Sequence, residues 1–193
     1  MPSEFQKQLK TFQRLPAQDG RRAAFLFVRD LQYGDIGSRN PLDVLKAGKG
    51  TCSGKHALLR LFLEAMGYEV QTWFARHDFR KFPITPWPEE LHSFQSKTLT
   101  DYHDFLKVNV DGMWLTVDAI FDKATEPFGF PVADWDGVSD MRLPVKAEEI
   151  FPAQGDPEEF KKALIGALPA QVQKDRKEFL AALTGMLDGR RAM

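Results

Sequence analysis

The feature that most constrains the fold is a glycine-rich turn that leads directly into a strongly apolar segment. The turn, Gly48-Lys49-Gly50, allows backbone conformations that other residues avoid. Thr51 can then cap a helix, because its hydroxyl can accept a hydrogen bond from a free N–H of the first turn. Nearly every residue from 57 to 66 is apolar, and Gly67 supplies a left-handed stop. A helix this apolar is buried on almost all sides, so the sequence predicts a central helix that begins at Cys52.

Cys52 is the only cysteine in the chain. At a helix N-terminus, the partial positive charge stabilises a thiolate, which is the reactive form of the side chain. Most lone cysteines are instead small buried hydrophobes. A catalytic role for Cys52 therefore requires a base elsewhere in the sequence.

Such a base occurs in a predicted β-hairpin over residues 103–118. Asp111-Gly112 separates two alternating runs and is typical of a two-residue type I′ turn. With this turn, Phe105 lies opposite Asp118, and His103 lies one diagonal step from Asp118 on the same face. The apolar residues at 106, 108, 110, 115 and 117 then line the other, core face. A slip of one residue would separate the imidazole from the carboxylate, so the pairing depends on this register.

The order of these parts resembles the transglutaminase-like superfamily, a branch of the papain-like cysteine enzymes. That family shows a Gly-x-Cys turn, an apolar helix ending in Gly, a strand, and then His…Asp-Gly-x-Trp…Asp. The matching segments here are residues 45–52 with the helix that follows, residues 67–74 and the hairpin, so the likeness covers roughly residues 21–122. Position by position, it implies Cys52 as the nucleophile, His103 as the base and acid, and Asp118 as the group that orients His103.

The chain departs from the family pattern just after the histidine. The family often has a small residue followed by Trp, whereas this sequence has Asp104 and Phe105. This difference from the family pattern affects the expected substrate-binding surface more than the three catalytic positions. Phe105 is therefore a candidate substrate-binding residue, together with aromatic residues from the irregular segments.

Two such segments, residues 77–102 and 121–151, have no predicted regular structure. Long irregular segments are uncommon in compact domains and often form binding walls. Trp87 in the first segment and Trp135 in the second are candidates for substrate contacts. The alternative is that these aromatic side chains pack on the core.

The resemblance implies an α+β fold with a papain-like core, in which the central helix packs on an antiparallel sheet. Residue patterns add helices at both ends of the chain. A C-terminal helical extension is predicted over about residues 156–189, because Asp156 can cap a helix that has Pro157 at its first position. Its apolar stripe, Phe179, Leu180, Leu183, Met186 and Leu187, fits docking on the same domain better than a partner site. The length of 193 residues predicts a single domain over residues 1–193.

Charge and motif content exclude several classes of function. The net charge of -1 offers no electrostatic case for binding nucleic acid or an anionic membrane. One cysteine and four scattered histidines do not have the spacing of a zinc site, and the sequence has neither a phosphate loop nor a dinucleotide fingerprint. We therefore expect no metal and no cofactor. His56 is an alternative base that fits a polar stripe of the helix better, and His77 and His92 are expected at the surface.

The chain contains no apolar run long enough to cross a bilayer and no apolar core of a signal peptide. A reducing cytoplasm is therefore the expected location, and it suits a free thiol. The sequence leaves the oligomeric state open.

The expected chemistry is acyl transfer through a thioester. Cys52 would attack a carboxamide or peptide carbonyl, with His103 taking or holding the thiol proton. The backbone N–H of Cys52 would donate to the oxyanion. The expected partner is thus a peptide, protein or small amide substrate. Hydrolysis is preferred to crosslinking because the chain lacks the extra β-domains of crosslinking relatives. The alternative is a catalytically inactive transglutaminase-like module that binds a protein or peptide.

Overall fold

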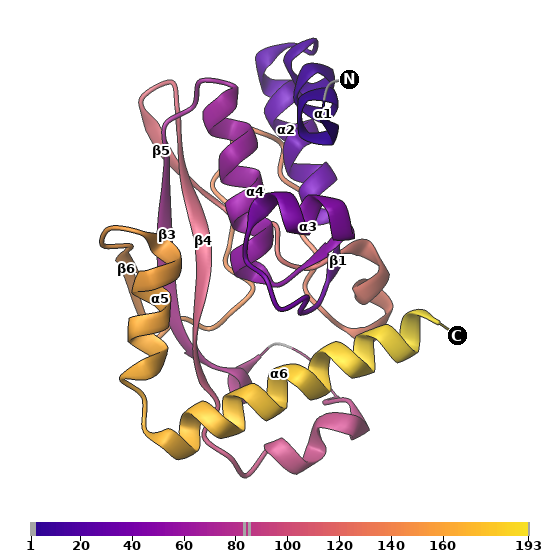
Figure 1. Ribbon diagram of the computed structural model, residues 1–193, viewed down its shortest axis with the longest axis vertical. Helices are drawn as coiled ribbons and strands as arrows, with labels where there is room; N and C mark the ends of the chain where they lie inside the picture. Colours follow the sequence, from indigo (N-terminus) through magenta and orange to yellow (C-terminus); the bar gives the residue numbers. More distant parts are fainter. Residues whose placement is uncertain (1–2, 83, 85, 193) are drawn as a thin grey trace.

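A four-stranded antiparallel sheet in the order β5-β4-β3-β6 forms one layer of the protein, and the helix α4 (Cys52–Ala65) packs against it (Figure 1). The structure is a computed structural model that describes residues 3–82, 84 and 86–192. The strands are β3 (Val70–Asp78), β4 (Thr100–Val110), β5 (Met113–Val117) and β6 (Glu149–Pro152). The predicted α+β arrangement, with a central helix on an antiparallel sheet, is confirmed.

The other helices surround α4 and the end of the sheet. The helices α2 (Ala17–Arg29) and α3 (Pro41–Ala47) pack against α4, and α1 (Glu4–Gln13) packs against α2. The helices α5 (Pro157–Gly166) and α6 (Ala170–Arg191) follow the sheet in the chain (Figure 1). A short parallel pair, β1 (Gln32–Tyr33) and β2 (Lys49–Gly50), precedes α4. The predicted helices at both ends of the chain are therefore present.

The body of α4 is buried on the side that faces the sheet and on the side that faces α2. Leu58, Leu59 and Phe62 are fully buried and share one core cluster with apolar residues of β4, β5 and α2. Thr51 precedes the first turn, as predicted, but its hydroxyl makes no capping hydrogen bond and is buried without a partner. The helix start is therefore held by other contacts.

The hairpin of β4 and β5 has the predicted register. Val110 lies opposite Met113, and Leu106 lies opposite Val117. Asp111 and Gly112 both have positive φ angles, 53° and 86°, as a type I′ turn requires. The apolar residues at 106, 108, 110, 115 and 117 all lie in the core that packs on α4. The turn and the alternation together account for the face on which each side chain lies.

The prediction that His77 lies at the surface is wrong. Strand β3 continues past residue 76 and pairs with β4 up to Asp78 opposite Thr100, so His77 is inside the sheet and only 2% exposed. The strand β6, which pairs with β3, begins within residues 121–151, a segment for which the sequence predicts no regular structure. Both differences arise from pairing between distant segments, which leaves little local pattern.

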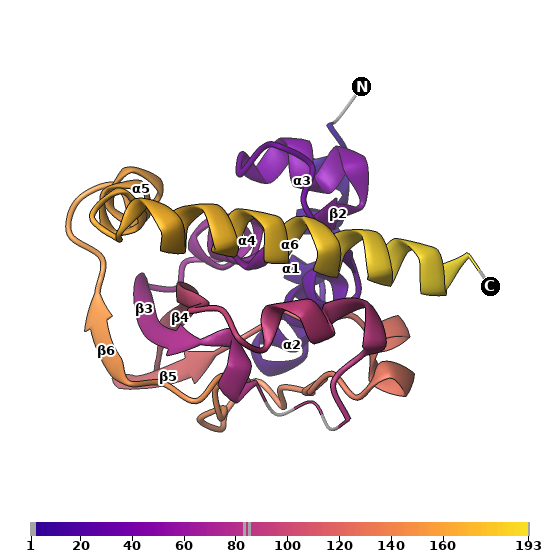
Figure 2. The ribbon, with the colours of Figure 1, turned by 90° about the horizontal axis from the view of Figure 1, so that it is seen from below.

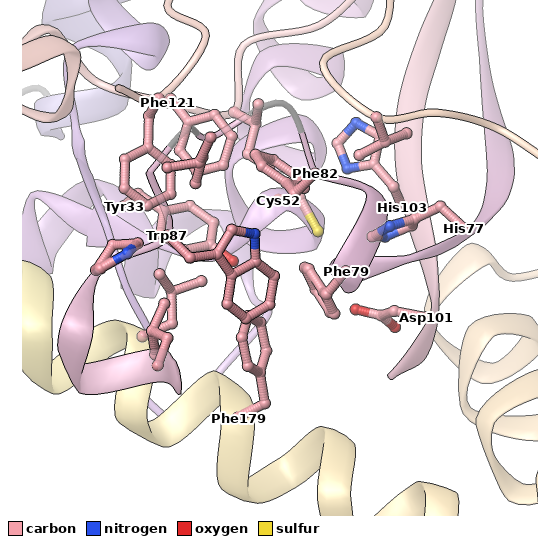
Figure 3. Close-up of a pocket in the computed structure, with 17 residues that line it drawn as sticks. Tyr33, Cys52, His77, Phe79, Phe82, Trp87, Asp101, His103, Phe121 and Phe179 are labelled. Atoms are coloured by element: carbon pink, nitrogen blue, oxygen red, sulfur yellow. The ribbon is translucent and has the colours of Figure 1, made fainter. Parts of the chain in front are cut away.

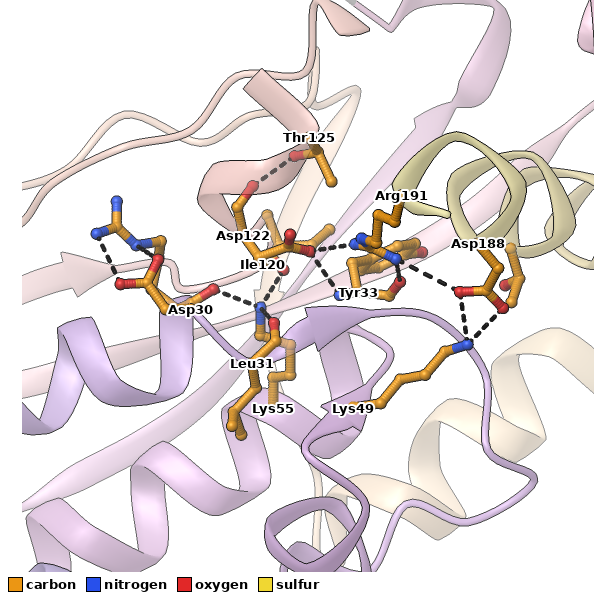
Figure 4. A network of polar contacts seen from close by, with 12 residues as sticks. Asp30, Leu31, Tyr33, Lys49, Lys55, Ile120, Asp122, Thr125, Asp188 and Arg191 are labelled. Carbon is orange, nitrogen blue, oxygen red and sulfur yellow. Dashed lines mark hydrogen bonds and ion pairs between the residues drawn. The ribbon is translucent and has the colours of Figure 1, made fainter. Parts of the chain in front are cut away.

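Lys55 anchors the first turns of α4. Its ammonium group donates to the backbone carbonyls of Arg29 at 2.9 Å, Leu31 at 2.9 Å and Ile120 at 2.6 Å (Figure 4). Burial lowers the pKa of Lys55 to about 7, although the nearby Asp122 carboxylate opposes the shift. These contacts tie α4 to the end of α2 and to the segment that follows β5.

The helix α6 crosses the N-terminal end of α4 (Figure 2). Phe179, Leu183, Met186 and Leu187 of its apolar stripe are buried in a second core cluster, which includes Cys52. The prediction that this stripe docks on the domain is therefore confirmed. None of the described helices has the length and hydropathy needed to cross a membrane.

Candidate active site

Cys52 is the first residue of α4 and is 8% exposed. The chain reaches it through Gly48, which ends α3 in the left-handed conformation with φ of 63°. Gly54, in the first turn of α4, lies where a Cβ atom would come within 2.7 Å of Val44 on α3. Glycine at these positions therefore allows the close turn that brings Cys52 to the helix start.

His103 and Asp118 form a buried pair at the end of the hairpin far from its turn. His103 Nε2 and Asp118 Oδ2 are 2.5 Å apart, and the two residues are 2% and 4% exposed. The other oxygen of Asp118 accepts a hydrogen bond from the backbone N–H of Ile120 at 3.2 Å. With Asp118 fixed in this way, Nε2 of His103 is the donor and Nδ1 is the nitrogen available to Cys52.

The charges of this pair reinforce each other. Burial lowers the pKa of His103, but the Asp118 carboxylate and the Cys52 sulfur more than offset this and raise it to about 10. Burial raises the pKa of Asp118, whereas the His103 ring holds it well below its usual range. At neutral pH the site therefore places an imidazolium beside the sulfur of Cys52.

His56, one turn along α4 from Cys52, lies next to Asp118 of the His103–Asp118 pair. Its Nε2 accepts a hydrogen bond from the backbone N–H of Ala119 at 2.9 Å, so this nitrogen carries no proton. An oxygen of Asp118 lies 3.5 Å from the same nitrogen. His56 therefore acts as an acceptor that positions the segment after β5, and we assign it no role as the base.

Lys161 of α5 is a site residue that sequence reasoning missed. Its Nζ lies 2.8 Å from Asp104 Oδ1, 2.9 Å from Ser53 Oγ and 3.6 Å from Cys52 Sγ. Asp104 thus pairs with Lys161 and Ser53, while Asp118 is the carboxylate bonded to His103. The available signal was Asp104, which lies two residues before Leu106 and so on the same, core face of β4. A carboxylate buried on that face needs a cationic partner.

Two cavities adjoin Cys52. One is an aromatic pocket of about 20 Å³, which Cys52 and His103 both face (Figure 3). Its walls come from the segment after β3, the segment after β5 and α6, and they include Phe79, Phe82, Trp87, Phe121 and Phe179. The other is an open cleft of about 630 Å³ with a more polar lining that includes Arg39, Ser53, Asp104 and Lys161. The sulfur is therefore placed between an almost filled apolar pocket and a cleft large enough for a ligand.

The three predicted substrate-binding residues lie in different places. Trp87 lines the aromatic pocket, with its ring 6.0 Å from that of Phe179. Phe105 is 1% exposed and packs within the core cluster around Cys52. Trp135 is also 1% exposed and packs against Phe25 in the other core cluster, at a ring distance of 5.9 Å. We therefore retain Trp87 in the candidate site and leave Phe105 and Trp135 out of it.

Within residues 3–82, 84 and 86–192, the His, Cys, Asp and Glu side chains form no group of three or more that could hold a metal ion. Two ion pairs lie beside Cys52, His103 with Asp118 and Lys161 with Asp104.

No protein-family model and no curated protein matches this chain. Among solved structures, the chain is similar to a candidate cysteine protease from Cytophaga hutchinsonii, with 18% sequence identity and a TM-score of 0.40. The match covers 62% of this chain and 39% of that chain. The chain thus matches about two fifths of the length of that protein.

Proposed function

We propose that this protein is a cysteine-dependent amide or peptide hydrolase, or an acyltransferase, in which Cys52, His103 and Asp118 act together. The observation that carries the proposal is the buried hydrogen bond between His103 and Asp118, beside a cysteine that begins a helix. A nucleophile, a base and a group that orients the base recur in this relationship in enzymes that form covalent intermediates.

The chemistry follows from these positions. The Cys52 thiolate attacks the carbonyl carbon of an amide, and the developing oxyanion faces the backbone N–H of Cys52, which has no acceptor within the helix. His103 gives its proton to the departing amine, and the carbon–sulfur bond of a thioester remains. Water then completes hydrolysis, or a second amine completes acyl transfer, with His103 accepting the proton of the attacking group. Asp118 keeps the His103 ring in place in both steps.

Iodoacetamide should alkylate Cys52 at least about tenfold faster than N-acetylcysteine at pH 6. The reason is that His103 and the helix N-terminus favour the thiolate at a pH where a free thiol, with a pKa of about 8.5, is almost wholly protonated. The measurement is the alkylation rate of the folded protein between pH 5 and pH 9, followed by mass spectrometry. His103→Ala should move the profile toward that of the free thiol, whereas the exposed His92→Ala serves as the matched control and should leave it unchanged.

A wild-type Cys52 that reacts no faster than N-acetylcysteine, with the same pH dependence after His103→Ala, would contradict the proposal. The alternative function is an inactive module that binds a peptide or protein in the open cleft. The low exposure of Cys52 and the small volume of the aromatic pocket favour this alternative. A folded protein that gives no adduct with thiol probes and no product from a panel of amide and peptide substrates would support it.

A further inference from the structure

The ammonium group of Lys161 has a complete set of partners in the site. A lysine ammonium carries three N–H donors. Three acceptors lie around Nζ of Lys161: the Asp104 carboxylate at 2.8 Å, the Ser53 hydroxyl at 2.9 Å and the Cys52 sulfur at 3.6 Å. The sulfur of the proposed nucleophile is therefore one of the acceptors around this cation.

The packing of α5 keeps Lys161 in this position. The neighbouring Phe160 packs its ring 5.7 Å from that of Phe74 and 6.3 Å from that of Phe151, which fixes α5 against β3 and β6. Lys161 itself is only 8% exposed. A buried lysine loses its hydration, so a position that retains one must supply charged or polar partners.

We infer that Lys161 is a second catalytic cation, which donates to the Cys52 sulfur and holds it as a thiolate together with His103. The inference rests on the proposed function and adds a residue from outside the segment that carries the family resemblance. An ionised acceptor makes a stronger hydrogen bond than a neutral one, so this contact favours the thiolate over the thiol.

The same contact acts on the second half of the reaction. When a thioester breaks down, water bonds to the carbonyl carbon, the carbon–sulfur bond breaks, and the sulfur takes the electron pair. Lys161 then donates to the thiolate that leaves, which makes the sulfur a better leaving group. The Lys161 ammonium therefore stabilises the Cys52 thiolate both before it attacks the substrate and when it leaves the thioester, and it exchanges no proton in either step.

Lys161 is not placed to accept the acyl group itself. Burial lowers the pKa of Lys161, but the charges of Asp104 and Cys52 outweigh this and raise the pKa above its ordinary value. At neutral pH the nitrogen has no free electron pair with which to attack a thioester. Its role is therefore electrostatic.

Other titratable or charged groups around Cys52 have their own partners or are neutral in the range of the assay. They include Tyr33 on β1, Arg39 before α3, His56 on α4, His77 on β3, Asp101 on β4 and Arg176 on α6. Arg176 pairs with Asp101 at 2.6 Å and Arg39 pairs with Asp35 at 2.8 Å. Burial lowers the pKa of His77 to about 4 and raises that of Tyr33, so both are uncharged between pH 5 and pH 9.

The test is the pH profile of Cys52 alkylation by iodoacetamide in the full chain, with thermal unfolding as the check on folding. Lys161→Met should lower the rate at pH 6 by at least about tenfold, because the sulfur loses a charged donor that lies 3.6 Å away and favours its anionic form. Lys161→Arg should retain most of the wild-type rate. Lys162→Met, on the next residue of α5 with a side chain that is 76% exposed, is the matched control and should leave the profile unchanged.

Lys161→Met also leaves Asp104 buried without its partner, so a double variant separates the two effects. Lys161→Met with Asp104→Asn removes both charges, and it should still slow alkylation at pH 6 because the sulfur has lost its cation. A double variant with the wild-type profile would overturn the inference, since the single variant would then act through the unpaired carboxylate. Unchanged profiles in both folded variants would also overturn it.

The two proposals fail differently in this assay. If wild-type Cys52 reacts no faster than a free thiol, the proposed function fails. If wild-type Cys52 reacts fast and His103→Ala slows it, while the folded double variant keeps the wild-type profile, only the role of Lys161 fails.

Discussion

Replacing Asp118 with Asn is expected to slow acylation of Cys52 by about 10²- to 10⁴-fold, the range that a positioned base and its orienting carboxylate supply. Asp118 Oδ1 accepts from the backbone N–H of Ile120, which should keep the amide oxygen of Asn at that position. The amide nitrogen would then donate to His103 Nε2, and the ring proton would move to Nδ1. A protonated Nδ1 in a neutral ring cannot accept a proton from Cys52.

The measurement is the release of p-nitrophenolate from p-nitrophenyl acetate, which reports acylation of the thiol. Asp140→Asn is the matched control, because Asp140 also accepts a backbone N–H, that of Thr116 at 2.6 Å, and its side chain is 62% exposed. An Asp118→Asn variant that is slowed no more than the Asp140→Asn variant would show that Asp118 does not orient the base.

The same variant has a signature in stability against pH. The raised pKa of His103 contributes stability that is full below the unfolded value of 6.5 and is lost as the pH rises through about 10. The lowered pKa of Asp118 contributes stability that is present above the unfolded value of 3.8 and is lost as the pH falls. The difference in unfolding free energy between wild type and Asp118→Asn should therefore be largest between these two unfolded values and decline toward pH 10.

Replacing Lys55 with Met is expected to lower the free energy of unfolding by about 3 kcal/mol at pH 5, because Lys55, with its pKa of about 7, carries its full charge there. A hydrogen bond to a charged group contributes about 1.5–3 kcal/mol, and the variant removes the common donor of three backbone carbonyls. Relief from burying an ammonium group offsets part of this loss, which is why the expected total is smaller than the sum of three such bonds.

Urea denaturation of both proteins measures the difference. Lys46→Met on α3 is the matched control because Lys46 is exposed, and a surface substitution of this kind changes stability by no more than about 0.5 kcal/mol. A Lys55→Met protein within about 1 kcal/mol of wild type would mean that the three carbonyls find other donors, and that Lys55 does not hold the start of α4.

The features of the fold that could be predicted from the sequence are those with local signals. Asp111-Gly112 and the alternation on either side of it set the register of β4 and β5, which brought His103 beside Asp118. The run of apolar residues in α4 predicted a buried helix in the same way. The hairpin pattern and the apolar run each lie within a short segment of the sequence, and the backbone geometry of each segment is determined by its own residues.

The features that could not be predicted depend on contacts between distant segments. Lys161 and Lys162 are adjacent lysines on an amphipathic helix, and nothing in their own neighbourhood shows that one is buried against Cys52 while the other is exposed. The aromatic residues of the irregular segments were equally ambiguous, since Trp87 lines a pocket and Trp135 fills the core. In both cases the packing of a remote element decides the outcome, so local propensity carries no signal.

The way in which α6 is docked makes the protein respond differently to different salts. Near each end of the helix a buried ion pair lies beside a more exposed one: Arg176–Asp101 with Lys97–Asp175, and Arg191–Asp122 with Lys49–Asp188. Mobile ions screen the exposed pairs most strongly, whatever the salt. The apolar stripe between them instead gains from strongly hydrated anions such as sulfate, which are excluded from the protein surface. At equal ionic strength, a chloride salt therefore weakens the ion pairs at both ends of α6. A sulfate salt also weakens these ion pairs, but it strengthens the packing of the apolar stripe of α6 in the core cluster that contains Cys52.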